Sequence, residues 1–132
     1  MIVLDASAAV ELLLERDAVG EWARARVAHA DSVHAPHLID LEVASALARL
    51  ARAREITATL GRLALTELVG MPIRRYPATR LLERIWRLRG ALTPYDAAYI
   101  ALAEALDAPL LTTDERLARS TGHGARIEAF PG

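Results

Sequence analysis

An unbroken apolar run that stops at a carboxylate opens this chain and limits the folds available to it. Three apolar residues extend from Ile2 to Leu4 and are followed directly by Asp5. A run without polar alternation is typical of a strand buried on both faces of a parallel sheet. Ligands of open α/β sheets bind outside the carboxyl ends of the strands, so Asp5 is a candidate site residue. Asp5 is an equally good candidate for capping the next helix, as is Ser7.

The composition indicates one cytoplasmic domain spanning residues 1–132. A chain of this length buries roughly two thirds of the surface that its unfolded form exposes. It has no cysteine, which excludes a disulfide framework and a thiolate metal site and is compatible with a reducing compartment. Its apolar runs are far shorter than the ~20 residues of a membrane span, and its N-terminus lacks the basic region of a signal peptide. We therefore expect no membrane partner.

The charge pattern argues against a protein that binds nucleic acid by bulk electrostatics. The net charge is −1, so contacts with phosphates require local basic patches. Arg80, Arg84 and Arg87 recur at helical spacing and form one such stripe, although pairing of Arg87 with Glu83 is the favoured alternative. All 16 basic residues are arginine. The abundant alanine favours codon bias in a GC-rich genome as the reason, over a demand for forked phosphate recognition.

Strand and helix patterns alternate along the chain, which predicts an α/β fold with a mainly parallel sheet. Two consecutive helices, 37–53 and 55–69, predict an αα-hairpin, a motif that often offers a groove for a partner. We expect strands at residues 2–4, 32–35, 71–76, 110–112 and 125–130. We expect the other helices at residues 8–15, 18–30, 77–90, 94–107 and 115–119.

Glu42 is an acid in an unusual position on the helix expected at residues 37–53. It lies one position off the apolar stripe of that helix. The residues three and four positions later are Ser45 and Ala46, so no ion pair within the helix is available in that direction. A structural explanation for this charge is therefore lacking.

Two further acids follow helix-start or strand-end signals. Thr93 followed by Pro94 is a helix start, which places Asp96 near the third helical position. Thr93 and Asp96 also fit the spacing of a capping box, which is the structural alternative. Asp114 comes just after the buried strand expected at 110–112, and it is equally able to cap the next helix.

The predicted sheet brings Asp5, Glu42, Asp96 and Asp114 to the same edge. Like charges within a few ångströms raise one another's pKa, so four crowded carboxylates are destabilising unless something compensates them. A divalent cation does so. Since the available ligands are oxygens, the cation expected is Mg²⁺, or Mn²⁺ in its place, rather than Zn²⁺.

In order along the chain, these segments resemble the PIN domain and, more narrowly, the VapC toxins of bacterial toxin–antitoxin pairs. The resemblance covers nearly the whole chain and keeps the four acids in order, although no single motif would suffice. It implies a three-layer α/β/α sandwich with the first strand central. The matching segments are Val-Leu-Asp5-Ala-Ser7, Glu42 in the helix after the second strand, Pro94-Tyr-Asp96-Ala-Ala-Tyr-Ile-Ala-Leu-Ala and Leu-Leu-Thr-Thr113-Asp114-Glu-Arg-Leu.

The resemblance also implies an activity and partners. The expected protein is a Mg²⁺-dependent endoribonuclease that hydrolyses RNA phosphodiester bonds, forms a homodimer and is neutralised by a cognate VapB antitoxin. The implied residue roles are Asp5, Asp96 and Asp114 as metal ligands or their close support, Glu42 as an acid that binds a second ion or orients water, and Ser7 and Thr113 as hydroxyl supports of the acids.

Two other functions are compatible with parts of the pattern. A phosphorelay receiver domain shares the size, the α/β fold and an acidic Mg²⁺ site, but that family uses an active-site lysine and this chain has none. A binding module without catalysis is the second. Helix capping explains Asp5, Asp96 and Asp114 one at a time, but leaves Glu42 unexplained. A nuclease assay with and without EDTA separates the three functions.

Overall fold

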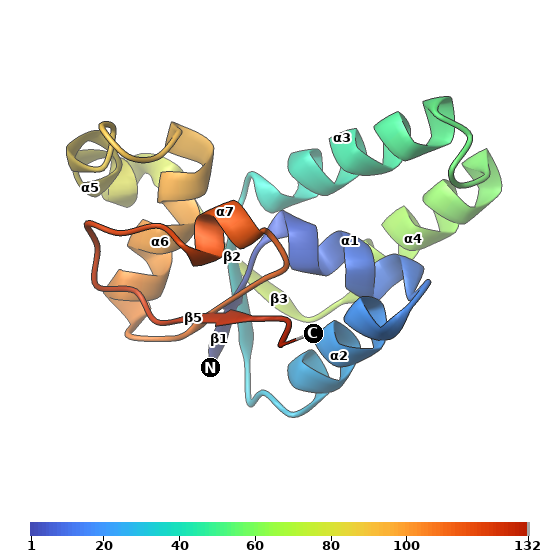
Figure 1. The fold of residues 1–132 in the computed structure, drawn as a ribbon, viewed down its shortest axis with the longest axis horizontal. Helices are drawn as coiled ribbons and strands as arrows, with labels where there is room; N and C mark the ends of the chain where they lie inside the picture. The colour runs from blue at the N-terminus through green and yellow to red at the C-terminus, as the bar shows by residue number, and fades with distance from the viewer. Residues whose placement is uncertain (132) are drawn as a thin grey trace.

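The computed structural model describes residues 1–131, which form a five-stranded sheet with helices on both faces (Figure 1). All four strand pairs are parallel, and the order is β3-β2-β1-β4-β5. The predicted α/β fold and the central position of the first strand are both confirmed. The strands are β1 (Ile2–Leu4), β2 (Val33–Pro36), β3 (Ile73–Tyr76), β4 (Leu110–Thr112) and β5 (Ile127–Ala129).

The helices form the two outer layers of the sandwich. Figure 1 shows α5 and α6 on one side of the sheet and α1 with α2 on the other. The helices are α1 (Ala6–Leu14), α2 (Ala18–Ala28), α3 (Ile39–Arg52), α4 (Ala58–Gly70), α5 (Leu82–Arg87), α6 (Pro94–Leu106) and α7 (Glu115–Ala118). Along residues 1–131, no helix is long and apolar enough to cross a membrane.

One predicted helix, residues 77–90, is wrong in its extent. The segment begins with a 3₁₀ turn at Ala78–Leu81 and continues only as the short helix α5. Neither start carries a side-chain cap, and Gly90, a poor helix former, lies just beyond the end. The favoured alternative to a basic stripe is confirmed, because Arg87 pairs with Glu83 at 2.8 Å, and Arg84 pairs with Glu104 at 2.7 Å.

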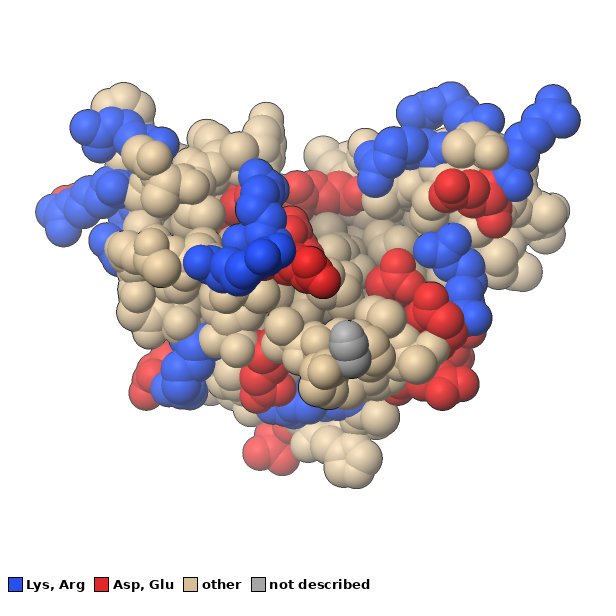
Figure 2. All heavy atoms as spheres, in the orientation of Figure 1, with Lys and Arg blue, Asp and Glu red and all other residues tan. Residues whose placement is uncertain are grey.

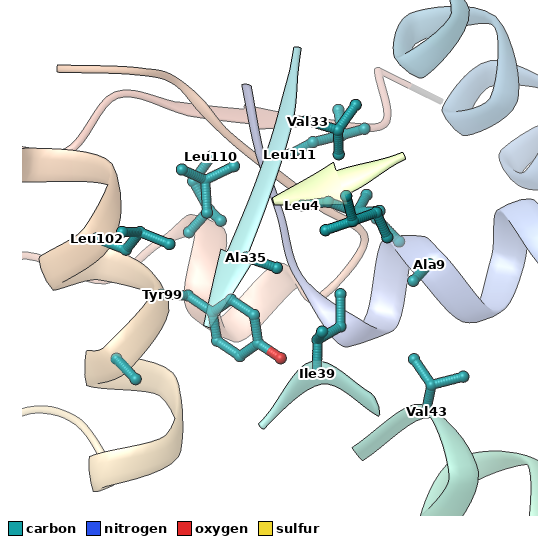
Figure 3. Close-up of a cluster of buried hydrophobic side chains, with 14 of the residues drawn as sticks. Leu4, Ala9, Val33, Ala35, Ile39, Val43, Tyr99, Leu102, Leu110 and Leu111 are labelled. Carbon is teal, nitrogen blue, oxygen red and sulfur yellow. The ribbon is translucent and has the colours of Figure 1, made fainter. Parts of the chain in front are cut away.

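The core explains why the central strands lack polar alternation. The residues of β1 are at most 1% exposed, because α6 packs against β1 and α1 packs against the neighbouring strand β4. Alanines such as Ala97 and Ala101 on α6 are buried, and they let this helix lie close to the sheet. Figure 3 shows Leu4, Leu110 and Leu111 packed between the two helix layers.

Helices α3 and α4 form the predicted αα-hairpin, which extends away from the sheet (Figure 1). The hairpin turns at Arg54, whose φ of 61° is left-handed, and α4 begins where the hydroxyl of Thr57 accepts from the N–H of Leu60. Its exposed side chains include Leu63 at 54% and Val69 at 82%. The hairpin therefore presents apolar surface to solvent.

Candidate functional site

The carboxyl ends of the central strands open into a cleft of about 430 Å³. Helix α1 follows β1, α3 follows β2 and α7 follows β4, so each brings its first residues to this edge. The space-filling view shows a hollow in this face of the molecule, with acidic side chains inside it and basic ones on its walls (Figure 2). The cleft is lined by all six residues singled out from the sequence, namely Asp5, Ser7, Glu42, Asp96, Thr113 and Asp114.

Asp5 lies at the buried end of the cleft and is held by hydroxyl and backbone donors. Its side chain is 4% exposed. One carboxylate oxygen accepts from the Ser7 hydroxyl at 2.7 Å and from the Ala8 N–H at 2.9 Å, and the other accepts from the Thr112 hydroxyl at 2.5 Å. Burial, with a smaller contribution from the charge of Asp114, raises the pKa of Asp5 to about 6 against the effect of these hydrogen bonds. Asp5 therefore caps α1 and also faces the site.

Glu42 is held by a residue to which sequence reasoning assigned no role. The Tyr99 hydroxyl, from α6, donates to Oε1 of Glu42 at 2.6 Å. Figure 3 shows Tyr99 reaching from α6 toward Ile39 of α3. Burial raises the pKa of Glu42, and the neighbouring charge of Asp96 adds to this effect while the Tyr99 bond opposes it. The position of Tyr99, three residues after Asp96 and so on the same helix face, was the available signal.

Tyr99 is placed among three of the acids. Burial raises its phenol pKa, and so do the hydrogen bond to Glu42 and the charges of Glu42, Asp5 and Asp96. The phenol therefore stays protonated and remains a hydrogen-bond donor. It fixes the Glu42 carboxylate, which explains why α3 carries an acid beside its apolar stripe.

Asp96 and Asp114 share one cation, Arg116. The guanidinium lies 3.0 Å from Oδ2 of Asp96 and 3.7 Å from Oδ2 of Asp114. Oδ1 of Asp114 accepts from the backbone N–H groups of Arg116 and Leu117, so Asp114 caps α7. Only half of the predicted capping box forms within residues 1–131: the Thr93 hydroxyl accepts from the N–H of Asp96, whereas the side chain of Asp96 accepts from Arg116 instead of the N–H of Thr93.

The hydroxyl that supports Asp5 from β4 belongs to Thr112 and not to Thr113. Successive strand residues face opposite sides of a sheet, and Thr112 is the one that faces Asp5. Thr113 lines the cleft and donates its backbone N–H to the Ser7 hydroxyl at 3.1 Å. The Thr112 hydroxyl also accepts from the N–H of Asp114 at 3.0 Å. These bonds tie the ends of β1 and β4 together.

The donor set of the cleft fits a hard divalent cation. Asp5, Glu42, Asp96 and Asp114 supply only carboxylate oxygens, the ligands that Mg²⁺ and Mn²⁺ prefer. Burial raises the pKa of Asp5 and of Glu42, and the ion pairs of the cleft acids within residues 1–131 involve Asp96 and Asp114 instead. In the described part of the chain, however, no three His, Asp or Glu side chains are gathered closely enough to hold an ion. The four acids therefore line one cleft without forming a compact cluster.

Comparison with known proteins identifies the family of this chain. The PIN domain family matches residues 2–122. Ribonuclease VapC9 of Mycobacterium tuberculosis is 48% identical over 117 residues, which are 89% of this chain and 88% of that protein. Ribonuclease VapC12 of the same species is 44% identical over 128 residues, covering 97% and 98% of the two chains.

Solved structures agree on the fold. The sarcin-ricin loop cleaving toxin VapC20 of M. tuberculosis superposes with a TM-score of 0.70 at 17% identity, covering 94% of this chain and 97% of that chain. The VapBC2 complex of Rickettsia felis, bound to a promoter DNA fragment, gives a TM-score of 0.70 at 12% identity and covers 98% and 99%. The chain belongs to the PIN-domain family, among its VapC ribonucleases.

Proposed function

We propose that this protein is a Mg²⁺-dependent endoribonuclease, the toxin of a toxin–antitoxin pair, and that residues 1–132 act as a single PIN domain in the cytoplasm. One observation carries the proposal: four carboxylates line one open cleft, and two of them, Asp5 and Glu42, are partly or fully buried there without a cationic partner among residues 1–131. The VapC relatives named as ribonucleases support RNA as the substrate.

In the proposed mechanism the protein mostly supplies placement. Mg²⁺ held there would supply charge to screen the anionic phosphodiester and would make water a better nucleophile at neutral pH. Asp5, Asp96 and Asp114 are proposed as the groups that hold the ion, with Mn²⁺ able to replace it. Glu42, oriented by Tyr99, is proposed to accept a proton from the attacking water or to hold that water in line. Ser7 and Thr112 keep Asp5 from turning away from the cleft.

Addition and removal of metal tests this proposal. We expect purified protein to cleave RNA with Mg²⁺ or Mn²⁺ and to lose that activity in EDTA. We also expect the metal to stabilise the folded protein, because it binds the assembled acids and not the unfolded chain. At 100 times its dissociation constant the gain is about 2.7 kcal/mol, measurable as a rise in melting temperature.

Ca²⁺ at equal ionic strength controls for screening, because it differs from Mg²⁺ in size and in the geometry it requires. Cleavage that persists undiminished in EDTA, after a fresh chromatographic step to remove a contaminating nuclease, would overturn the metal-dependent mechanism. If the protein neither cleaves RNA nor binds metal under any condition, a binding module is favoured instead.

The partners follow from the same relationship. A VapB-type antitoxin is supported by the VapC relatives and by the VapBC2 neighbour. We propose that it lays an apolar segment along the exposed face of the α3–α4 hairpin, which carries Leu63 and Val69. We also propose that the protein forms a homodimer, which light scattering of the purified toxin tests.

Leu63→Glu is expected to weaken antitoxin capture strongly, because it places a charge in the proposed apolar contact. Leu82→Glu on α5 is the matched control, since Leu82 is 55% exposed and Leu63 is 54% exposed. The measurement is recovery of the antitoxin from a co-expressing strain with tagged toxin. Equal recovery with both variants would move the antitoxin interface off the hairpin while leaving the nuclease proposal intact.

A further inference from the structure

Arg116 is an exposed cation that contacts two of the acids lining the cleft. It stands at the second position of α7, and one terminal nitrogen faces Oδ2 of Asp96 at 3.0 Å and Oδ2 of Asp114 at 3.7 Å. Within residues 1–131, no other basic side chain lies within ion-pair distance of the four acids of the cleft. We propose that Arg116 is a positioning residue, which offsets the charges of Asp96 and Asp114 in the metal-free site and competes with the divalent cation for them. This inference rests on the proposed function.

The geometry of Asp114 shows why this contact differs from a chance surface ion pair. Oδ1 of Asp114 is committed to capping α7, at 2.9 Å from the N–H of Arg116 and 3.3 Å from that of Leu117. The oxygen that remains for a cation is Oδ2, and this is the oxygen that Arg116 faces. A metal ion bound at Asp114 therefore requires the same oxygen.

Asp96 adds the second half of the contact. It comes from the start of α6, far from α7 in sequence, and its side chain is only 20% exposed. Without a cation between them, two carboxylates brought to one wall of a cleft repel each other. The guanidinium reduces that repulsion in the metal-free protein.

Arg116 offsets the charges of Asp96 and Asp114 but not those of Asp5 and Glu42. Asp5 is bound by hydroxyl and N–H donors, and Glu42 by the Tyr99 hydroxyl. The side chain of Arg116 is itself 74% exposed, and ion pairs of exposed arginines are weak. Arg116 is therefore easily displaced from the acids. While it stays in place, its positive charge repels a divalent cation that binds to them.

The test is a calorimetric titration of the full-length protein with Mn²⁺ in the absence of RNA. Arg116→Gln removes the charge and is expected to tighten Mn²⁺ binding by about tenfold, while Arg116→Lys keeps a positive charge and stays near wild type. Arg119→Gln is the matched control. Arg119 directly follows the same short helix as its C-cap and is 77% exposed, and among residues 1–131 it pairs with Glu115 alone, so its loss leaves Mn²⁺ affinity unchanged.

A purely structural role for Arg116 predicts weaker Mn²⁺ binding in Arg116→Gln, because a disordered acid pair binds metal more weakly. The inference is overturned if Arg116→Gln binds Mn²⁺ no more tightly than wild type. It is also overturned if Arg119→Gln tightens Mn²⁺ binding to the same extent, or if no variant binds Mn²⁺. Arg116→Ala repeats the test with a second variant, should Arg116→Gln fail to fold. If the wild-type protein cleaves RNA but Arg116→Gln does not bind Mn²⁺ more tightly, this inference alone is contradicted. Tightened binding without RNA cleavage by wild type contradicts the proposed function alone.

Discussion

Asp5→Asn is expected to abolish RNA cleavage while making the metal-free protein more stable at pH 7.5. The asparagine oxygen still accepts from Ser7 and Ala8, and its amide donates to the Thr112 hydroxyl, whose hydrogen turns to the Ser7 oxygen 3.2 Å away. The variant therefore preserves the hydrogen bonds and removes a buried charge. Cleavage falls by at least about a hundredfold, which corresponds to about 2.7 kcal/mol of transition-state stabilisation.

The gain in stability follows from the raised pKa of Asp5, about 6 instead of 3.8. A carboxyl group whose pKa is raised by folding favours the folded state below pH 3.8, and this contribution is lost as the pH rises through about 6. At pH 7.5 the buried charge therefore costs about 3 kcal/mol, which Asp5→Asn recovers. Urea unfolding in EDTA at pH 7.5 and at pH 5 measures this, and the difference between variant and wild type narrows at the lower pH.

Asp17→Asn is the matched control for Asp5→Asn. Asp17 also caps a helix, accepting from the N–H groups of Val19 and Gly20, but lies outside the cleft. We expect unchanged cleavage in this control. An Asp5→Asn protein that cleaves RNA at the wild-type rate would remove Asp5 from the mechanism. An Asp5→Asn protein less stable than wild type at pH 7.5 would instead show that the hydrogen bonds outweigh the buried charge.

Asp96→Asn is expected to remove cleavage with little effect on folding. Asp96 makes no side-chain cap, so the change loses only its ion pair with the exposed Arg116, which is worth about 0 to 1 kcal/mol. It also removes the charge that helps raise the pKa of Glu42. We expect cleavage to fall by about a hundredfold or more. The melting temperature with and without Mg²⁺ and the initial rate of RNA cleavage measure the two effects separately.

Asp107→Asn tests whether removal of an acid at the other end of α6 also abolishes RNA cleavage. Asp107 ends this helix with a φ of 49°, a left-handed conformation that asparagine also tolerates, and its side chain is 90% exposed. The control should keep both activity and stability. A folded Asp96→Asn variant with wild-type cleavage and metal binding would exclude Asp96 from the site.

The main features of the fold could be read from local sequence. The apolar run of β1, the capping signal at Thr93 and the alternation of strands with helices each depend on neighbouring residues. Such features need no knowledge of distant contacts. The family and the α/β architecture were confirmed for the same reason, while the metal and catalytic roles of the acids stay predictions.

What only the tertiary structure decided is which side chains meet in the cleft. The Tyr99–Glu42 bond joins residues 57 positions apart, and the Thr112–Asp5 bond joins residues 107 positions apart. Whether Thr112 or Thr113 supports Asp5 depends on which face of β4 turns toward β1, and the approach of Arg116 to Asp96 depends on how α7 packs beside α6. Local sequence determined which acids reach the edge of the sheet. The packing of distant segments decided what holds each of them, because hydrogen bonds and ion pairs form only between groups that the fold brings within about 3 Å.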